Sequence, residues 1–201
     1  MTDDALRCAT AEEFAAWMEA HHSAAGEVWL ALPKKGTGVA SVTRSEALDV
    51  ALCYGWIDGK AFSGGVPDGW WAQRFSPRRA RSPWSKINCA RVEELIATGR
   101  MRPAGLEQVE QAKADGRWAA AYAPPSTAEV PPELQAALDA SPAAATAFAA
   151  LSKSSRYQIL LTLQKAKKAE TRARRIAGYV ERLEAGEPPH GPARSRTTSP
   201  G

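Results

Sequence analysis

The most chemically suggestive stretch of the chain is residues 73–91, QRFSPRRARSPWSKINCAR, which holds six cationic side chains and no carboxylate. These cations are Arg74, Arg78, Arg79, Arg81, Lys86 and Arg91. Guanidinium groups bind carboxylates and phosphates through paired hydrogen bonds, and they also stack on indole rings. Because Trp56, Trp70, Trp71 and Trp84 lie close to or within this cationic stretch, the residue types predict a pocket for an anion with aromatic walls.

Polar residues at the predicted start of the following helix add hydrogen-bond donors. Ser85 directly follows Trp84 and Asn88 comes three residues later, and backbone amides at a helix N-terminus favour negative charge. The predicted ligand-binding residues of this part of the chain are therefore Trp56, Asp58, Arg74, Arg78, Trp84, Ser85 and Asn88. In the alternative interpretation, the indole rings belong to the core and the arginines to the solvated surface, and this alternative is favoured for Trp17 and Trp29.

Asp58, in WIDGK, is the candidate catalytic residue. A carboxylate among aromatic neighbours can have a raised pKa and act as a general acid or base, and it can also orient an arginine. The alternatives are a structural ion pair and an Asp-Gly turn. Whether the chain is an enzyme is left open by the sequence.

A second cationic cluster lies near the C-terminus, where Lys165, Lys168, Arg172 and Arg175 follow spacings of three, four and three. On one long helix, predicted from about Ser155 to Ala185, these side chains form a stripe beside the apolar face. Basic side chains in such places often stay solvated, which is the alternative interpretation. We predict that Lys168 and Arg172 close the anion site, which requires the two clusters to meet in space.

Several other classes of site are disfavoured by motif and composition. Cys8, Cys53 and Cys89 are an odd number without metal-ligand spacing, so neither a disulfide framework nor a metal site is expected, and no cofactor is expected either. Common catalytic motifs such as GxSxG, HExxH and the Walker loop are absent. The net charge of +4 and the lack of a familiar nucleic-acid-binding motif argue against nucleic acid, which is kept as a third hypothesis.

The N-terminal residues and the apolar runs of the chain indicate where the protein is located. The N-terminus, MTDDALRC, is acidic where a signal peptide would be basic, and no eighteen apolar residues run together. We therefore expect a cytoplasmic protein with reduced thiols and no membrane span.

The elements that must position these residues indicate an α+β fold, with a small antiparallel sheet packed with helices and a helical C-terminal part. Helices are predicted to begin after Thr10, Thr43 and Ser85 and at Pro103, and strands at Val28–Leu32, Trp56–Phe62 and Trp70–Phe75. The expected organisation is an α+β domain over residues 1–122, a Pro-rich linker over 123–132, a helical region over 133–186 that packs on the first domain, and a disordered tail over 187–201.

Five motifs resemble a known bacterial family. KKGTG at 34–38, EALDVALCYGWIDG at 46–59, QRFSPRRARSPWSKIN at 73–88, GRMRPAGLEQVEQAKADGRW at 99–118 and AKKAETRARRI at 166–176 are similar to the YdeI/OmpD-associated (OmdA-like) family of bacteriocin-protection proteins. The resemblance runs from about Thr10 to Gly186. It implies a part in antimicrobial-peptide and stress resistance through association with an envelope protein, and it supplies no catalytic residues.

The leading hypothesis is thus a soluble binding protein that takes an anionic small molecule, or an acidic segment of a protein partner, in a cleft lined by Trp and Arg. The second is an enzyme that acts on such an anion with Asp58 as general acid or base. A mildly basic protein repels a cationic peptide, so direct sequestration of such a peptide at either cationic cluster is disfavoured.

Overall fold

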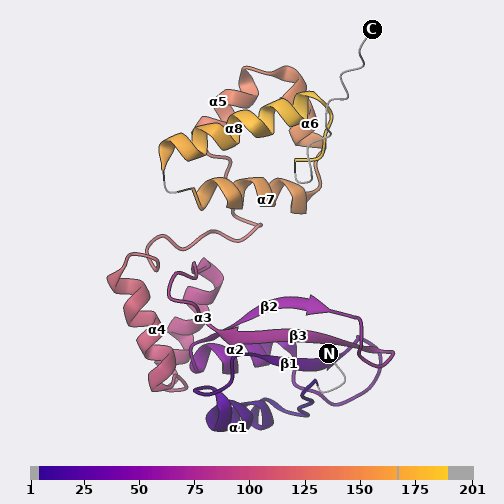
Figure 1. Cartoon of the computed structure of the whole chain (residues 1–201), viewed down its shortest axis with the longest axis vertical. Helices are drawn as coiled ribbons and strands as arrows, with labels where there is room; N and C mark the ends of the chain where they lie inside the picture. Colours follow the sequence, from indigo (N-terminus) through magenta and orange to yellow (C-terminus); the bar gives the residue numbers. More distant parts are fainter. Residues whose placement is uncertain (1–4, 167, 190–201) are drawn as a thin grey trace. The chain divides into compact units, whose positions relative to one another are not determined.

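The structure, a computed structural model, describes residues 5–166 and 168–189. The chain divides into two compact units, residues 1–121 and 122–201, which are coloured along the sequence in Figure 1. Unit 1 contains a three-stranded antiparallel sheet with helices, and the described part of unit 2 is helical. This composition confirms the predicted α+β class.

The sheet of unit 1 is built from β1 (Val28–Pro33), β2 (Trp56–Phe62) and β3 (Trp70–Pro77) in the order β1-β3-β2. The predicted hairpin is confirmed, because β2 and β3 pair antiparallel, with an irregularity in register between Asp58 and Ala61. Alternation along the strands turns Leu30 and Phe75 toward the core, where both are fully buried.

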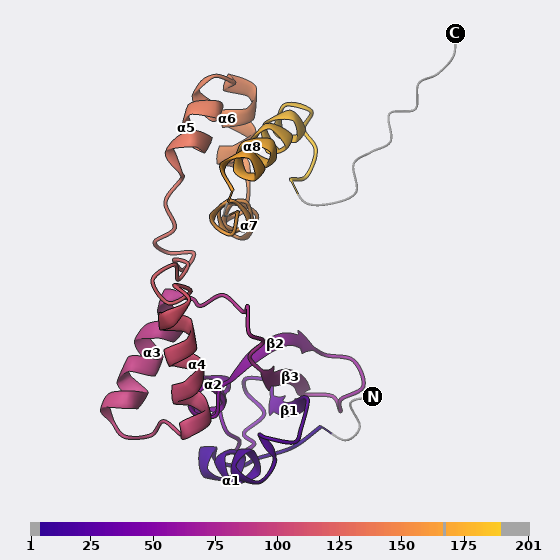
Figure 2. The same ribbon diagram turned by 60° about the vertical axis from the view of Figure 1, so that its left-hand side comes forward.

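Four helices complete unit 1: α1 (Ala11–His21), α2 (Arg44–Cys53), α3 (Lys86–Ala97) and α4 (Pro103–Ala114). The predicted start signals are confirmed, since Thr10, Thr43 and Ser85 each accept a hydrogen bond from the backbone amide three residues later. Figure 2 shows α1 and α2 on one side of the sheet. They form the core with it, and Phe14 of α1 contacts Phe75 with ring centroids 5.5 Å apart.

A glycine lets α4 pack closely against the end of α2. A Cβ atom placed at Gly105 would lie 2.3 Å from the carbonyl oxygen of Cys53. That carbonyl already accepts a hydrogen bond from the backbone amide of Arg102. The close approach thus fixes the chain just before α4 against α2.

The described part of unit 2 contains α5 (Pro132–Asp139), α6 (Pro142–Ala150), α7 (Lys153–Gln164) and α8 (Ala169–Glu184). They enclose a separate core, to which each helix contributes buried apolar residues: Leu134, Leu138, Ala144, Phe148, Ile159, Leu160, Leu163, Ile176, Tyr179 and Leu183. The residues between the sheet unit and α5, 123–131, contain turns and no helix or strand.

The prediction of one long helix from Ser155 to Ala185 is wrong, because the chain leaves the helix after α7 and begins α8 at Ala169. In one straight helix, Ile159 and Leu183 would lie about 36 Å apart and could not share a core. The chain instead folds back, and α7 and α8 contact each other. Arginines of α8 stabilise the break, since Arg175 donates to the Thr162 carbonyl at 2.6 Å and Arg172 to the Ala166 carbonyl at 3.3 Å.

The expected packing of the helical region on the first domain stays a prediction. Residues 190–201 of the expected disordered tail lie outside the described residues. In the ranges that the structure covers, no helix has both the length and the apolar character needed to cross a bilayer.

Candidate functional site

A cationic pocket of unit 1 lies where the chain connects β1 to α2. It has a volume of about 490 Å³, and we call it the 34–44 pocket after the segment that forms most of its lining. Its polar lining comprises Lys34, Lys35, Thr37, Ser41, Thr43 and Arg44, and Trp71 of β3 forms part of its apolar wall. All the described residues that line it are cationic, hydroxyl-bearing, apolar or glycine, and none is a carboxylate.

Hydrogen bonds hold the lysine-bearing loop against the neighbouring hairpin. The backbone amide of Lys34 donates to the carbonyl of Gly69 at 2.7 Å, and the Thr37 hydroxyl donates to the Lys34 carbonyl at 3.1 Å. Gly36 has a positive φ of 89°, a conformation that favours glycine and makes the tight turn feasible. Lys34 and Lys35, which line the pocket, are both exposed.

The guanidinium of Arg44 is held at the edge of the pocket by two side chains of the sheet. Its Nη2 donates to the Asp58 carboxylate at 2.5 Å, and its Nε donates to Gln73 Oε1 at 3.2 Å. Gln73 is only 1% exposed, and its Nε2 donates to the Gly59 carbonyl at 2.9 Å. This chain of contacts makes Asp58 the partner that orients Arg44, one of the roles considered for it from the sequence.

The N-terminus of α2, which also borders the pocket, is already capped by a carboxylate. Glu46 accepts hydrogen bonds from the Thr43 backbone amide and hydroxyl, both at 2.8 Å. The hydrogen bond from the Thr43 backbone keeps the pKa of Glu46 below its usual value, so that the carboxylate is charged. An anion in the 34–44 pocket would therefore depend on the lysines and Arg44 rather than on the helix dipole.

Two of the predicted ligand-binding residues lie elsewhere in unit 1. Trp56 is 1% exposed and packs in the core, where its indole N–H donates to the His22 carbonyl at 3.2 Å. Arg74 forms an ion pair with Glu27, with 2.7 Å between Nε and Oε2. The hydrogen bond from Arg74 lowers the pKa of Glu27, so the pair stays charged near neutral pH.

Arg78, Trp84, Ser85 and Asn88 are brought together at the start of α3. The Arg78 guanidinium carbon lies 3.8 Å from the centre of the Trp84 ring, and its Nη2 donates to the Pro83 carbonyl at 2.7 Å. Ser85 caps α3 by accepting from the Asn88 amide at 3.1 Å. Arg78 is 7% exposed and Trp84 2%, so this group is a packed cation–π contact that fixes the turn into the helix.

Lys168 and Arg172, the remaining predicted residues, belong to unit 2. Lys168 is exposed at the N-terminal end of α8, and Arg172 forms an ion pair with Glu133 at 3.1 Å. Because the two cationic clusters lie in different units, their meeting in space stays a prediction.

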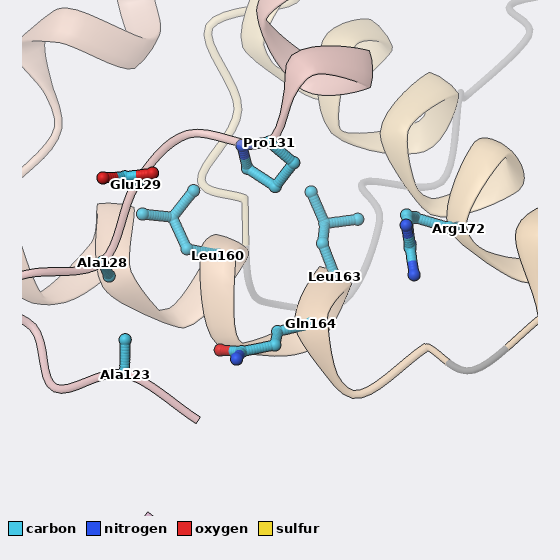
Figure 3. A pocket seen from close by; sticks show the side chains of 8 residues that line it. All are labelled: Ala123, Ala128, Glu129, Pro131, Leu160, Leu163, Gln164 and Arg172. Carbon is cyan, nitrogen blue, oxygen red and sulfur yellow. The ribbon is translucent and has the colours of Figure 1, made fainter. Parts of the chain in front are cut away.

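Arg172 also lines a pocket of about 300 Å³ between α7 and the segment that precedes α5. Figure 3 shows Arg172 and Glu129 on opposite sides of this pocket, with Leu160 and Leu163 between them. Since Glu129 also lines it and Arg172 is already bonded to Glu133 and Ala166, this pocket is less suited to an anion than the 34–44 pocket.

Sequence reasoning did not assign chemistry to Lys34, Lys35 and Arg44. The feature of the sequence that could have indicated this pocket is KKGTG, a pair of lysines followed by two glycines, which lies between a buried strand and a capped helix. Among the residues that the structure describes, no group of three or more His, Cys, Asp or Glu side chains could hold a metal ion.

Comparison with known families divides the chain at nearly the same place as the two units. Residues 6–108 match the family described as Domain of unknown function (DUF8412), and residues 127–186 match OmdA, described as Bacteriocin-protection, YdeI or OmpD-Associated. Comparisons with curated proteins and with solved structures found no match. The OmdA match is thus narrower than the resemblance quoted from the sequence, most of whose motifs lie before residue 127. The chain therefore belongs to the DUF8412 family, whose model covers about half its length, and a part of unit 2 is similar to the OmdA family.

Proposed function

We propose that this protein binds an anionic small molecule in the 34–44 pocket. The observation that carries the proposal is the lining, in which Lys34, Lys35 and Arg44 are accompanied by hydroxyl groups and by no carboxylate. A volume of about 490 Å³ falls within the usual range for small-molecule sites, roughly 300–1,000 Å³. Arg44 is already paired with Asp58, so the surplus positive charge of the lining comes from Lys34 and Lys35, and this surplus favours an acidic ligand.

The pocket also supports a particular kind of anion. Arg44 is oriented by Asp58 and Gln73, so little side-chain entropy is lost when its planar fork binds a phosphate or carboxylate. Trp71 is half-buried in the wall and offers a flat apolar surface. The ligand that fits best carries an acidic group at one end and a planar apolar group at the other.

Three probes separate these two contributions: phenyl phosphate, inorganic phosphate and phenol. Titration calorimetry should show that phenyl phosphate binds most tightly, that phosphate binds more weakly, and that phenol does not bind. Lys34→Ala combined with Lys35→Ala should weaken phenyl phosphate about tenfold, in line with two partly exposed charge contacts. Trp71→Leu should reduce its affinity toward that of inorganic phosphate.

The matched control is Lys86→Ala, which removes an exposed lysine of the cationic stretch that does not line the pocket. Equal losses in the control and in the double variant would refute the pocket as the site. Tight binding of an oligonucleotide, with an affinity that falls steeply with salt, would favour the nucleic-acid hypothesis instead.

A contribution to bacteriocin protection is part of the proposal and is supported by the match to the OmdA family, which is described as Bacteriocin-protection, YdeI or OmpD-Associated. So is an association with an envelope protein, which that description suggests through the name OmpD. The test is survival of a deletion strain exposed to a bacteriocin, complemented with the wild type or with the Lys34→Ala/Lys35→Ala variant. Equal survival of the deletion strain and its parent would remove this part of the proposal.

A further inference from the structure

Unit 2 carries an open groove between α5 and α8 whose chemistry is the opposite of that of the 34–44 pocket. The α5–α8 groove has a volume of about 550 Å³. Its apolar lining is made by Ala137, Ala140, Ala173, Ile176, Ala177 and Val180, and its charged lining by Glu133, Glu181 and Glu184. None of the described residues that line it is cationic.

Two contacts show how the groove is laid out. Glu133, near the start of α5, pairs with Arg172 near the start of α8 at 3.1 Å. The Ser141 hydroxyl, just beyond α5, donates to Glu184 near the end of α8 at 2.6 Å. The two helices therefore run in the same direction, and they lie side by side in Figures 1 and 2. Carboxylates stand at both ends of the groove with the apolar residues between them.

The size of the lining residues suits a helix as the occupant. From Ala173 to Glu184 the groove follows α8 for about 17 Å, which corresponds to about three helical turns. Ala173 and Ala177 are exposed on α8, and small side chains allow the backbone of a third helix to approach within the usual 8–10 Å between axes. Ile176 and Val180 add larger apolar surface beside them.

The charges decide which helix fits. Glu181 and Glu184 are exposed at one end of the groove, and Arg172 balances only Glu133 at the other. A helix that buries apolar residues against the alanines would place its flanking side chains beside these carboxylates. Lysine or arginine at those positions would be attracted, and aspartate or glutamate would be repelled.

We propose that the α5–α8 groove docks a cationic amphipathic helix of a partner polypeptide. This inference goes beyond the anion site of unit 1 and does not depend on it. An amphipathic helix laid into an apolar groove is a common mode of peptide recognition, with anchors at every third or fourth residue.

The test measures fluorescence anisotropy of labelled peptides with the full-length protein. The probe is an amphipathic peptide of about 14 residues built from leucine and lysine at helical spacing, long enough to fold on the protein although marginal alone. Its partner peptide has glutamate in place of every lysine. The lysine peptide should bind and the glutamate peptide should not, and equal binding of both would overturn the proposal.

Variants then locate the binding. Glu181→Gln combined with Glu184→Gln should weaken the lysine peptide about fivefold to tenfold, while Glu170→Gln on the same helix, outside the groove, should leave it unchanged. Ala177→Phe should block binding by filling the groove, with the far-ultraviolet circular dichroism spectrum confirming that α8 is intact. An unchanged affinity in both groove variants would place the peptide elsewhere and overturn the proposal.

Two further outcomes are informative. Loss of peptide binding in Lys34→Ala/Lys35→Ala would tie it to unit 1 and contradict the independence of the two sites. A dimer in sedimentation experiments that Ala177→Phe dissociates would assign the groove to a second copy of this chain and not to a cationic helix.

Discussion

Substitution of Gly105 by alanine tests how closely α4 must approach α2. The added Cβ would lie 2.3 Å from the Cys53 carbonyl oxygen and 2.8 Å from the Leu52 carbonyl oxygen. An ordinary van der Waals contact begins at 3.4 Å, so α4 would have to move by about 1 Å. The Cys53 carbonyl cannot turn away freely, because it accepts the hydrogen bond of the Arg102 amide at 3.1 Å.

The expected change in the free energy of unfolding is the balance of two terms. Overpacking of a rigid backbone contact costs about 1–3 kcal/mol or more, and three close backbone atoms place this site at the upper end. Replacing glycine by alanine inside a helix gains up to about 1 kcal/mol. We expect a net destabilisation of unit 1 of about 2 kcal/mol, or a fall in Tm of roughly 5–10 °C.

Tryptophan emission is the natural assay, since all seven tryptophans lie between residues 17 and 118 and report on unit 1 alone. The matched control is Gly178→Ala in α8, where a Cβ would meet no atom within 4 Å. It should raise the stability of unit 2, followed by circular dichroism, by up to about 1 kcal/mol. A Gly105→Ala protein as stable as the wild type would refute the packing argument.

Three other changes give separate tests. Asp58→Asn should lower the free energy of unfolding by less than about 1 kcal/mol, because the Arg44–Asp58 ion pair is partly exposed. It should nevertheless weaken the binding of phenyl phosphate, because Arg44 loses the partner that orients it. If the variant instead loses turnover on a substrate found later while binding is unchanged, Asp58 has a catalytic role. Arg175→Ala should destabilise unit 2 by about 1–2 kcal/mol through the Thr162 carbonyl that it leaves without its donor, with circular dichroism changed and tryptophan emission unchanged. Burial raises the pKa of the Cys8 thiol from 9.0 to about 11, so the unfolded chain loses the thiol proton at a lower pH than the folded chain does. The free energy of unfolding should therefore fall as the pH rises from about 9 to 11. The urea midpoint measures this fall, and a Cys8→Ala variant should lack this contribution to it.

The elements of unit 1 could be predicted because their signals are local. Thr43 and Glu46 form the capping box that their spacing indicates, and the turn formers between Trp56 and Trp70 mark the hairpin. The break between α7 and α8 could not be predicted in this way. No proline or glycine interrupts residues 155–177, and the helix ends because its two halves must bury Ile159 and Ile176 in one core.

The functional residues were harder to predict because charges in a sequence have no visible partners. The cationic stretch contains no carboxylate, yet Arg74 meets Glu27 and Arg91 meets Asp49, 47 and 42 residues away. Indole rings near these arginines suggested a wall, but Trp56 is needed to fill the core beside the sheet. Of the cations of the 34–44 pocket, Lys34 and Lys35 belong to the KKGTG motif, whereas Arg44 lies in none of the motifs.

The net charge of the chain also gave an incomplete view of its partners. A charge of +4 suggested repulsion of cationic peptides, but at physiological salt a charge acts over a Debye length of about 8 Å. Over that range a ligand in the α5–α8 groove is influenced mainly by Glu181 and Glu184, and one in the 34–44 pocket mainly by Lys34 and Lys35. The two sites should therefore select ligands of opposite sign.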